Sequence, residues 1–491
     1  MASSFHVENF GCRAARADGE AIAALLRTSG ASEDRPADAQ VVIVNTCSVT
    51  AEADREARAY IRRAHRQNPE ARIIATGCYA QRAPEELAAI PGVAAVIGNS
   101  HKALAPEVAL QLMGAPLRSA SYGKNLIQIQ AAKAAAAAPQ VLADDSFAHS
   151  FLEEAPITSG AQTRPNLKIQ EGCSNRCSFC VIPQTRGNSR SLSASSVLNH
   201  VRRFVETGGK ELVLSGINLG RWGRDLDRSH SEPRALAALV RAIFEKTGLP
   251  RLRLSSIEPM DWDADLIAVV SEFAGNRLAR HAHLPLQSGS DSVLRRMHRR
   301  YRPWHYAEKV HELLRAAGPA LTLGADVMVG FPGETDREFR ESCDFIHSLP
   351  FGYLHLFPFS SRPGTRAWTL HAENPVPAQI VDERMAVLRA LAAEKTRTHR
   401  TRFVGAEFDA ITLNTPPALA ASGCTSALTD NFLPVEVSAS LPANRLVQIR
   451  ITELTADNGL LATPVRSTGS QNESHFLAGP APAEPVLENA F

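Results

Sequence analysis

The chain has 491 residues, which is too long for one ordinary hydrophobic core and predicts two to four domains. Its net charge of +2, with 21% charged residues, indicates a soluble globular protein, and a pI near 8.1 does not decide whether its partner is a polyanion. Neither an apolar signal core at the start nor an apolar run of about 18 residues is present, so we expect a cytoplasmic protein with no membrane segment.

Eight cysteines in such a chain favour metal ligands or redox chemistry over a disulfide framework, because the cytosol is reducing and the chain can build a core without cross-links. Six of the eight occur in two suggestive groups. Cys343 and Cys424 stand apart from both groups, and we expect them to be buried free thiols.

The first part of the chain alternates strand and helix patterns. Apolar, β-prone runs at residues 4–11, 40–46 and 71–77 are separated by segments whose apolar residues follow a helical spacing. This alternation predicts a small parallel α/β domain over residues 1–118.

A cysteine follows each of these three runs, at Cys12, Cys47 and Cys78. Ligands collect at the carboxyl ends of parallel strands, so the three thiols would converge in space. For one such cysteine alone, a small buried residue is the better interpretation. Because all three occupy the same point of successive strands, we predict a shared metal site.

Residues 119–162 are rich in alanine, with prolines and acids but no sustained apolar face, and are predicted to form an interdomain linker. Strand and helix patterns then return over residues 163–400. Six apolar strand candidates lie there, at residues 167–171, 211–216, 251–256, 281–287, 321–330 and 353–359. Six units in about 235 residues predict an open, partial (β/α)6 barrel whose carboxyl-end loops carry the site.

Cys173, Cys177 and Cys180 follow the first strand of this barrel, with CxxxCxxC spacing. A zinc knuckle requires a fourth cysteine or histidine nearby, and a ferredoxin loop uses C-x2-C-x2-C spacing with a remote fourth cysteine. Three thiolates instead suit a 4Fe–4S cluster that keeps one iron open for an exogenous ligand.

The CSNRCSFC segment after a first barrel strand resembles the radical S-adenosylmethionine superfamily. That resemblance implies that the open iron binds the methionine moiety of S-adenosylmethionine. It also implies that TGGKELVLSG approaches the methionine amino group through Gly208, Gly209 and Glu211, and that LTLGADVMVGFPGE, with Gly330, lies near the adenine.

The added three-cysteine α/β domain and a small terminal β module make the chain similar to the methylthiotransferases of that superfamily. This resemblance implies two 4Fe–4S clusters. One cleaves S-adenosylmethionine to a 5′-deoxyadenosyl radical, and the other delivers sulfur that a second S-adenosylmethionine methylates. It also implies an electron donor such as flavodoxin or ferredoxin, and we expect a monomer.

The segments around SGINLG, SSIEPMDWDADLI and HAHLPLQSGS look most similar to the branch that modifies carbon 2 of threonylcarbamoyladenosine at position 37, in the anticodon stem-loop of tRNA. Asn218 is the distinguishing residue. The alternatives are the branches that act on isopentenyladenosine tRNA or on an aspartate of a ribosomal protein. A non-catalytic iron–sulfur redox sensor is a third alternative, which no feature favours.

A basic run over residues 294–306 mixes arginines with aromatic residues, as phosphate neutralisation and base stacking require. The residues predicted to contact RNA phosphates are Arg295, Arg296, Arg299 and Arg300. A solvated helix face is the alternative.

Residues 401–468 carry short alternating runs that predict a small β-barrel resembling the RNA-binding, TRAM-like barrel of these enzymes. Residues 401–470, however, contain four arginines, no lysines and six acidic residues, and such a negative net charge does not favour binding to phosphates. The barrel would then recognise shape or bases, or brace its neighbour. Residues 469–491 are predicted to be a disordered tail.

Overall fold

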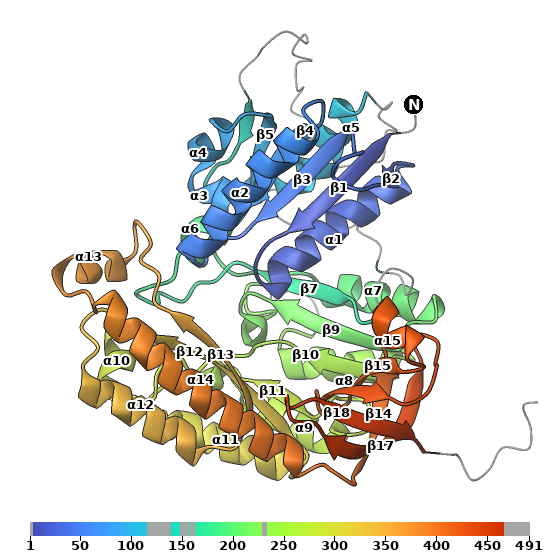
Figure 1. Ribbon diagram of the computed structural model, residues 1–491, viewed down its shortest axis with the longest axis vertical. Coiled ribbons are helices and arrows are strands. Elements are labelled where there is room, and N and C mark those ends of the chain that lie inside the picture. Colours follow the sequence, from blue (N-terminus) through green and yellow to red (C-terminus); the bar gives the residue numbers. More distant parts are fainter. Residues whose placement is uncertain (1–2, 115–138, 148–156, 158–162, 228–232, 466–491) are drawn as a thin grey trace, which may run out of the picture.

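The computed structural model describes residues 3–114, 139–147, 157, 163–227 and 233–465. Figure 1 shows an N-terminal α/β domain above a curved array of parallel strands, with a small β-barrel beside that array. The predicted α/β class and the three folded units are confirmed. None of the described helices is both long and apolar enough to cross a membrane.

The N-terminal domain is a parallel sheet between two helical layers. Its strand order is β2-β1-β3-β4-β5-β6, and the strands are β1 (Ser4–Asn9), β2 (Ser32–Glu33), β3 (Val41–Thr46), β4 (Arg72–Gly77), β5 (Val93–Gly98) and β6 (Gln140–Leu142). The helices are α1 (Arg13–Thr28), α2 (Ala51–Gln67), α3 (Cys78–Arg82), α4 (Pro84–Ala88), η1 (Asn99–Leu104) and α5 (Ala105–Leu112). Every residue of β3 is buried because apolar clusters cover both faces of the sheet.

Strand β6 lies inside the segment predicted to be a linker. Residues Gln140–Leu142 pair in parallel with β5 and complete the edge of the N-terminal sheet. Most of the remaining predicted linker lies outside the described residues. The chain therefore returns to its first domain before it enters the second.

All six strands predicted for the central domain are present. They are β7 (Asn166–Glu171), β9 (Glu211–Gly216), β10 (Arg251–Leu254), β11 (His281–His283), β12 (Thr322–Val329) and β13 (Phe351–Pro358). They form two parallel groups, β10-β9-β7 and β11-β12-β13, and the short β8 (Arg190–Ser191) adds antiparallel to β7. A backbone hydrogen bond of 3.0 Å from Ile257 to His283 helps to join the groups.

Helices cover the outer face of these strands and bury the apolar side chains there in one large cluster. The helical elements are α6 (Ile182–Arg186), α7 (Ala194–Glu206), η2 (Leu219–Arg221), α8 (Leu236–Lys246), η3 (Pro259–Asp261), α9 (Ala264–Phe273), α10 (Asp291–Arg296), α11 (Pro303–Ala317), α12 (Asp336–Ser348), α13 (Arg366–Glu373) and α14 (Ala378–Thr401). The opposite face of β11, β12 and β13 carries polar side chains, among them His281, His283 and Asp326.

The C-terminal unit is a closed barrel of β14 (Glu407–Thr412), β15 (Thr425–Thr429), β16 (Pro434–Val437), β18 (Leu460–Pro464) and β17 (Leu446–Leu454), with α15 (Pro417–Ala421) at its side. Its β15–β16 turn docks against the central domain. Arg280 binds the Asp430 carboxylate with two hydrogen bonds of 2.6 and 3.0 Å, and Arg253 donates to the Thr429 carbonyl oxygen. The small barrel thus braces the central strands.

Candidate active site

The three N-terminal cysteines share one edge of their sheet. Cys12 caps the start of α1, Cys47 follows β3, and Cys78 begins α3 directly after β4. Strands β1, β3 and β4 are neighbours and parallel, so their carboxyl ends meet. Gly11 makes the close approach possible, since a Cβ atom on it would lie 2.3 Å from the Cβ of Cys47.

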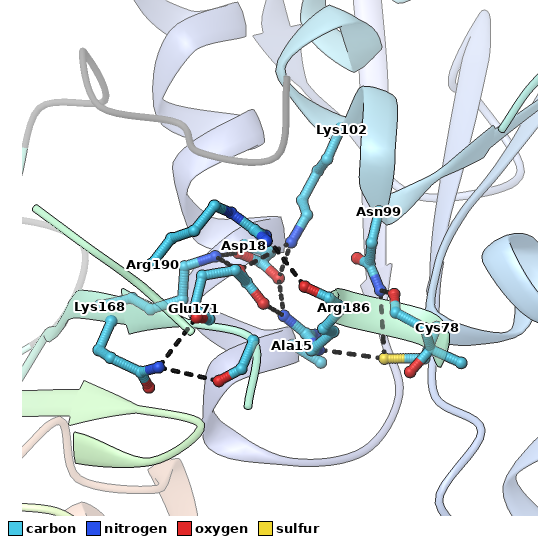
Figure 2. Close-up of polar contacts among 12 residues, drawn as sticks. Ala15, Asp18, Cys78, Asn99, Lys102, Lys168, Glu171, Arg186 and Arg190 are labelled. Carbon is cyan, nitrogen blue, oxygen red and sulfur yellow. Dashed lines mark hydrogen bonds and ion pairs between the residues drawn. The ribbon is translucent and has the colours of Figure 1, made fainter. Parts of the chain in front are cut away.

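Two of these thiols, Cys47 and Cys78, are buried, whereas Cys12 is exposed. Burial, followed by the neighbouring Cys78 and Cys12 thiols, raises the pKa of Cys47 to about 12. Two donors point at Cys78 Sγ: Arg186 Nε at 3.2 Å and Asn99 Nδ2 at 3.3 Å (Figure 2). A thiolate needs such donors when it is removed from water.

Arg186 comes from the other domain, six residues after Cys180, and it is fully buried. Its guanidinium also pairs with Glu171 at 2.6 Å and with Asp18 at 3.1 Å (Figure 2). Although burial lowers the pKa of Arg186, the charges of Cys78, Glu171 and Asp18 outweigh that effect and hold the pKa above its usual range. Arg186 therefore stays cationic beside the N-terminal thiols.

The second triad occupies the loop between β7 and α6. Cys173 Sγ accepts from the Asn175 backbone at 3.4 Å and from Asn218 Nδ2 at 3.7 Å. Cys177 Sγ accepts from Arg299 Nη1 at 3.3 Å, and burial, followed by the Cys177 thiol, raises the pKa of Cys180 to about 12. Each triad thus has one arginine that donates to one of its thiols.

Each donor set has three thiols, the number that leaves one iron of a 4Fe–4S cube open. Among the described residues, no group of three or more His, Cys, Asp or Glu side chains is arranged to hold one metal ion. Three thiolates with a neighbouring cation suit the charge of such a cluster at both places.

The barrel interior also fits a polar cofactor. Four buried side-chain oxygens near the carboxyl ends of β9, β10 and β11 have no hydrogen-bond partner among the described residues: Ser215 Oγ, Asn218 Oδ1, Ser255 Oγ and Gln287 Oε1. Gln287 also adopts a left-handed φ of +66°, which is strained for this residue type. Buried polar atoms of this kind are available to a polar ligand or to water.

The structure places three of the four predicted cofactor residues away from this end. Gly208 and Gly209 form the turn before β9, and Glu211 is its first residue, whereas Cys173 follows the carboxyl end of the parallel strand β7. Glu211 is instead buried and paired with arginines, and the Gly208 carbonyl accepts from Asn444 of the small barrel. Gly216–Asn218 is the segment beside the thiols, and Gly330 lies at the carboxyl end of β12.

The four predicted RNA-binding arginines do not form one surface. Arg299 is 7% exposed and pairs with Glu258 at 2.6 Å besides Cys177, so its expected phosphate contact is wrong. Arg296 is bound by both oxygens of Glu338. Arg295 and Arg300 are more exposed and stay candidates for a phosphate contact. They lie in separate ion pairs, Arg295 with Asp291 and Arg300 with Asp261.

Several functional residues escaped the sequence analysis. The donors Arg186 and Asn99 belong to no motif, although Arg186 lies six residues after Cys180. For Arg299 the sequence predicts an RNA contact and not its hydrogen bond to Cys177. The two isolated cysteines differ from expectation, because Cys343 and Cys424 are both partly exposed instead of fully buried.

Comparisons with known proteins show which families the chain resembles. The family described as "Uncharacterized protein family UPF0004" matches residues 4–98, and "Radical SAM superfamily" matches residues 167–346. Among solved structures, the radical S-adenosylmethionine methyltransferase TsrM from Kitasatospora setae has a TM-score of 0.54 at 15% identity, covering 76% of this chain and 78% of that one. This likeness concerns the fold alone. Fold and site define the class: a radical S-adenosylmethionine enzyme with a second cysteine-bearing domain.

Two curated relatives narrow the class. Threonylcarbamoyladenosine tRNA methylthiotransferase MtaB of Bacillus subtilis (strain 168) is 35% identical over 401 residues, which is 82% of either chain. The tRNA-2-methylthio-N(6)-dimethylallyladenosine synthase of Syntrophotalea carbinolica is 32% identical over 409 residues, covering 82% of this chain and 86% of that one. The chain belongs to the MtaB-like radical S-adenosylmethionine methylthiotransferase family.

Proposed function

We propose that the enzyme adds a methylthio group to carbon 2 of threonylcarbamoyladenosine at position 37 of tRNA, with one 4Fe–4S cluster on each cysteine triad and two S-adenosylmethionine molecules. The observation that carries this proposal is the contact of Arg186 with Cys78, because it joins the first triad to the segment that bears the second. Several MtaB relatives, with names that specify this nucleoside, support the substrate.

The chain's own residues would divide the work. Cys173, Cys177 and Cys180 would hold the cluster that, when bound, supplies the electron for cleaving S-adenosylmethionine. Cys12, Cys47 and Cys78 would hold the cluster that supplies sulfur. Arg299 and Arg186 keep a positive charge beside one thiolate of each set, and the polar atoms of Ser215, Asn218, Ser255 and Gln287 would orient the bound cofactor.

The experiment compares substrates in parallel. The anaerobically reconstituted enzyme is incubated with reductant, S-adenosylmethionine and one of three substrates: tRNA bearing threonylcarbamoyladenosine, tRNA bearing isopentenyladenosine, or ribosomal protein. We expect the methylthio nucleoside from the first tRNA only. Product on only one of the other two substrates would overturn the assignment to threonylcarbamoyladenosine tRNA. In addition, tRNA from cells that lack the gene should lack the methylthio nucleoside.

A further inference from the structure

The inner face of β11, β12 and β13 carries polar and aromatic side chains. Strand register puts His281 and His283 on the same face as Gly324 and Asp326 and, across β13, Tyr353 and His355. Barrel interiors are usually packed with branched aliphatic residues, whereas here the aliphatic residues of β12 pack outward, among them Leu323, Ala325 and Val327.

Gly324 shows that this face is built around the Tyr353 ring. A Cβ atom on Gly324 would lie 2.1 Å from Cζ of Tyr353, so a side chain there would displace the ring. The Tyr353 hydroxyl lies 2.8 Å from His281 Nε2, and the Ser256 hydroxyl lies 2.7 Å from His283 Nδ1. These contacts fix the orientation of both imidazole rings.

Residues from the two flanking domains extend this cluster of polar and aromatic side chains. Phe432, in the β15–β16 turn of the small barrel, takes a left-handed φ of +68° and stacks on His281 with 4.2 Å between ring centroids. Arg13, the residue after Cys12, places its guanidinium carbon 5.8 Å from the Phe432 ring centroid. The cluster therefore contains residues of all three domains, and Arg13 directly follows Cys12 of the N-terminal triad in sequence.

Among the described residues, one cation of this cluster has no ion-pair partner. Arg13 is exposed and has no ion-pair partner among the described residues, whereas the nearby Arg253 pairs with Glu211 at 3.0 Å. His281 Nδ1 and His283 Nε2 are buried and make no hydrogen bond among those residues. Asp326 is the acidic side chain on this face, with Oδ1 3.4 Å from His283 Nε2. Such a set suits a ligand that carries one carboxylate together with N–H and hydroxyl groups.

We propose that Arg13 binds the carboxylate of the threonylcarbamoyl substituent while His281, His283 and Asp326 bind its urea and hydroxyl groups. The inference rests on the proposed function and explains how the site would reject the apolar isopentenyl substituent, which leaves the buried polar groups unpaired. Arg13 is then a specificity-determining residue.

The test uses the reconstituted full-length enzyme and synthetic anticodon stem-loops that carry threonylcarbamoyladenosine as the free acid or as its methyl ester. A charge-assisted hydrogen bond contributes roughly 1.5–3 kcal/mol, so we expect the wild-type enzyme to bind the acid about 10- to 100-fold more tightly than the ester in fluorescence anisotropy. Arg13→Gln should bind both RNAs with the weaker affinity. Arg16→Gln, on the same helix and exposed beside Glu20, is the matched control and should keep the preference.

The acid–ester comparison uses the unaltered enzyme, so it decides the carboxylate contact even where Arg13→Gln fails to fold. Equal binding of acid and ester, or a preference that survives in a folded Arg13→Gln variant with full iron content, would overturn the inference. If the wild-type enzyme then still methylthiolates the free acid, the proposed function stands. No product on that RNA overturns both.

Discussion

At the scale of single residues, burial decides whether an arginine of this enzyme binds a cysteine sulfur or is accessible to RNA. Arg299 and Arg186 are 7% and 0% exposed, and each donates to a cysteine sulfur. Arg295, four residues before Arg299, has 61% of its side chain exposed. A buried guanidinium must pair fully with anions and cannot leave them for RNA, because an unpaired buried charge is costly.

The first prediction separates these roles by salt dependence. Replacing both Arg295 and Arg300 by alanine should reduce the slope of log K against log salt for tRNA binding by roughly 0.7–0.9 per lost phosphate contact. Arg337→Ala is the control, since that arginine is 84% exposed on α12. A slope that does not change in the double variant would make the two arginines ordinary solvated surface residues.

At the scale of elements, the sequence predicts which residues follow the carboxyl ends of neighbouring parallel strands, but not which residues meet across a domain interface. Cys12, Cys47 and Cys78 could be grouped from sequence because each follows a recognisable parallel strand, and that order alone implies a shared edge. Glu211 is expected from sequence to approach the methionine, yet it begins β9, because a glycine pair near a strand does not reveal which end of the strand faces the site. The donors Arg186 and Asn99 depend on how two domains pack, which no local pattern encodes.

Glu211 instead ties the amino ends of the central strands together, which gives a prediction about pH. Burial alone would raise the pKa of Glu211, but Arg253, Arg164 and Arg251 outweigh it and lower the pKa to about 2. Since this is below the unfolded value of 4.5, the stabilisation is complete above pH 4.5 and is lost as pH falls toward 2. The shift corresponds to about 3 kcal/mol.

The corresponding variant is Glu211→Gln, measured by calorimetry of the cluster-free protein. It should be less stable than the wild type by about 3–5 kcal/mol at neutral pH, because it leaves buried arginines uncompensated. The difference in Tm should shrink as pH falls from 5 to 3. Glu407→Gln removes an exposed pair with Arg450 and should change Tm little. A gap that is constant with pH would argue against the ion-pair explanation.

At the scale of the whole molecule, a buried charge network fixes the two cysteine-bearing domains to one another. Asp18 of α1 lies 2.5 Å from Lys102 and also pairs with Arg186 and Lys168 of the central domain (Figure 2). Glu171 closes the network through the same cations. Two carboxylates paired with three buried cations restrict how the domains can pack, and would thereby fix the distance between the two cysteine triads.

Asp18→Asn should therefore loosen the domain interface. Removing one partner of a buried network costs about 3–5 kcal/mol, so we expect a lower Tm and faster hydrogen exchange in α1 and β7. Asp38→Asn serves as the surface control, because Asp38 is 44% exposed and its partner Arg35 is 81% exposed, so that solvent screens the ion pair. Equal protection of α1 and β7 in both variants would show that apolar packing alone sets the domain arrangement.

In the proposed reaction the triad of the central domain serves cleavage of S-adenosylmethionine and the N-terminal triad serves sulfur transfer, so neither domain alone can complete it. A variant with alanine at Cys173, Cys177 and Cys180 should lose about half of its iron and all cleavage of S-adenosylmethionine, since three thiolates with an open iron are needed there. A variant with alanine at Cys12, Cys47 and Cys78 should lose a similar share of iron, keep cleavage in the presence of reductant and form no methylthio nucleoside. Iron content and 5′-deoxyadenosine are measured beside the product, so loss of folding is distinguished from loss of sulfur transfer. Full iron in the first variant, or undiminished product from the second, would contradict the assignment of one cluster to each triad.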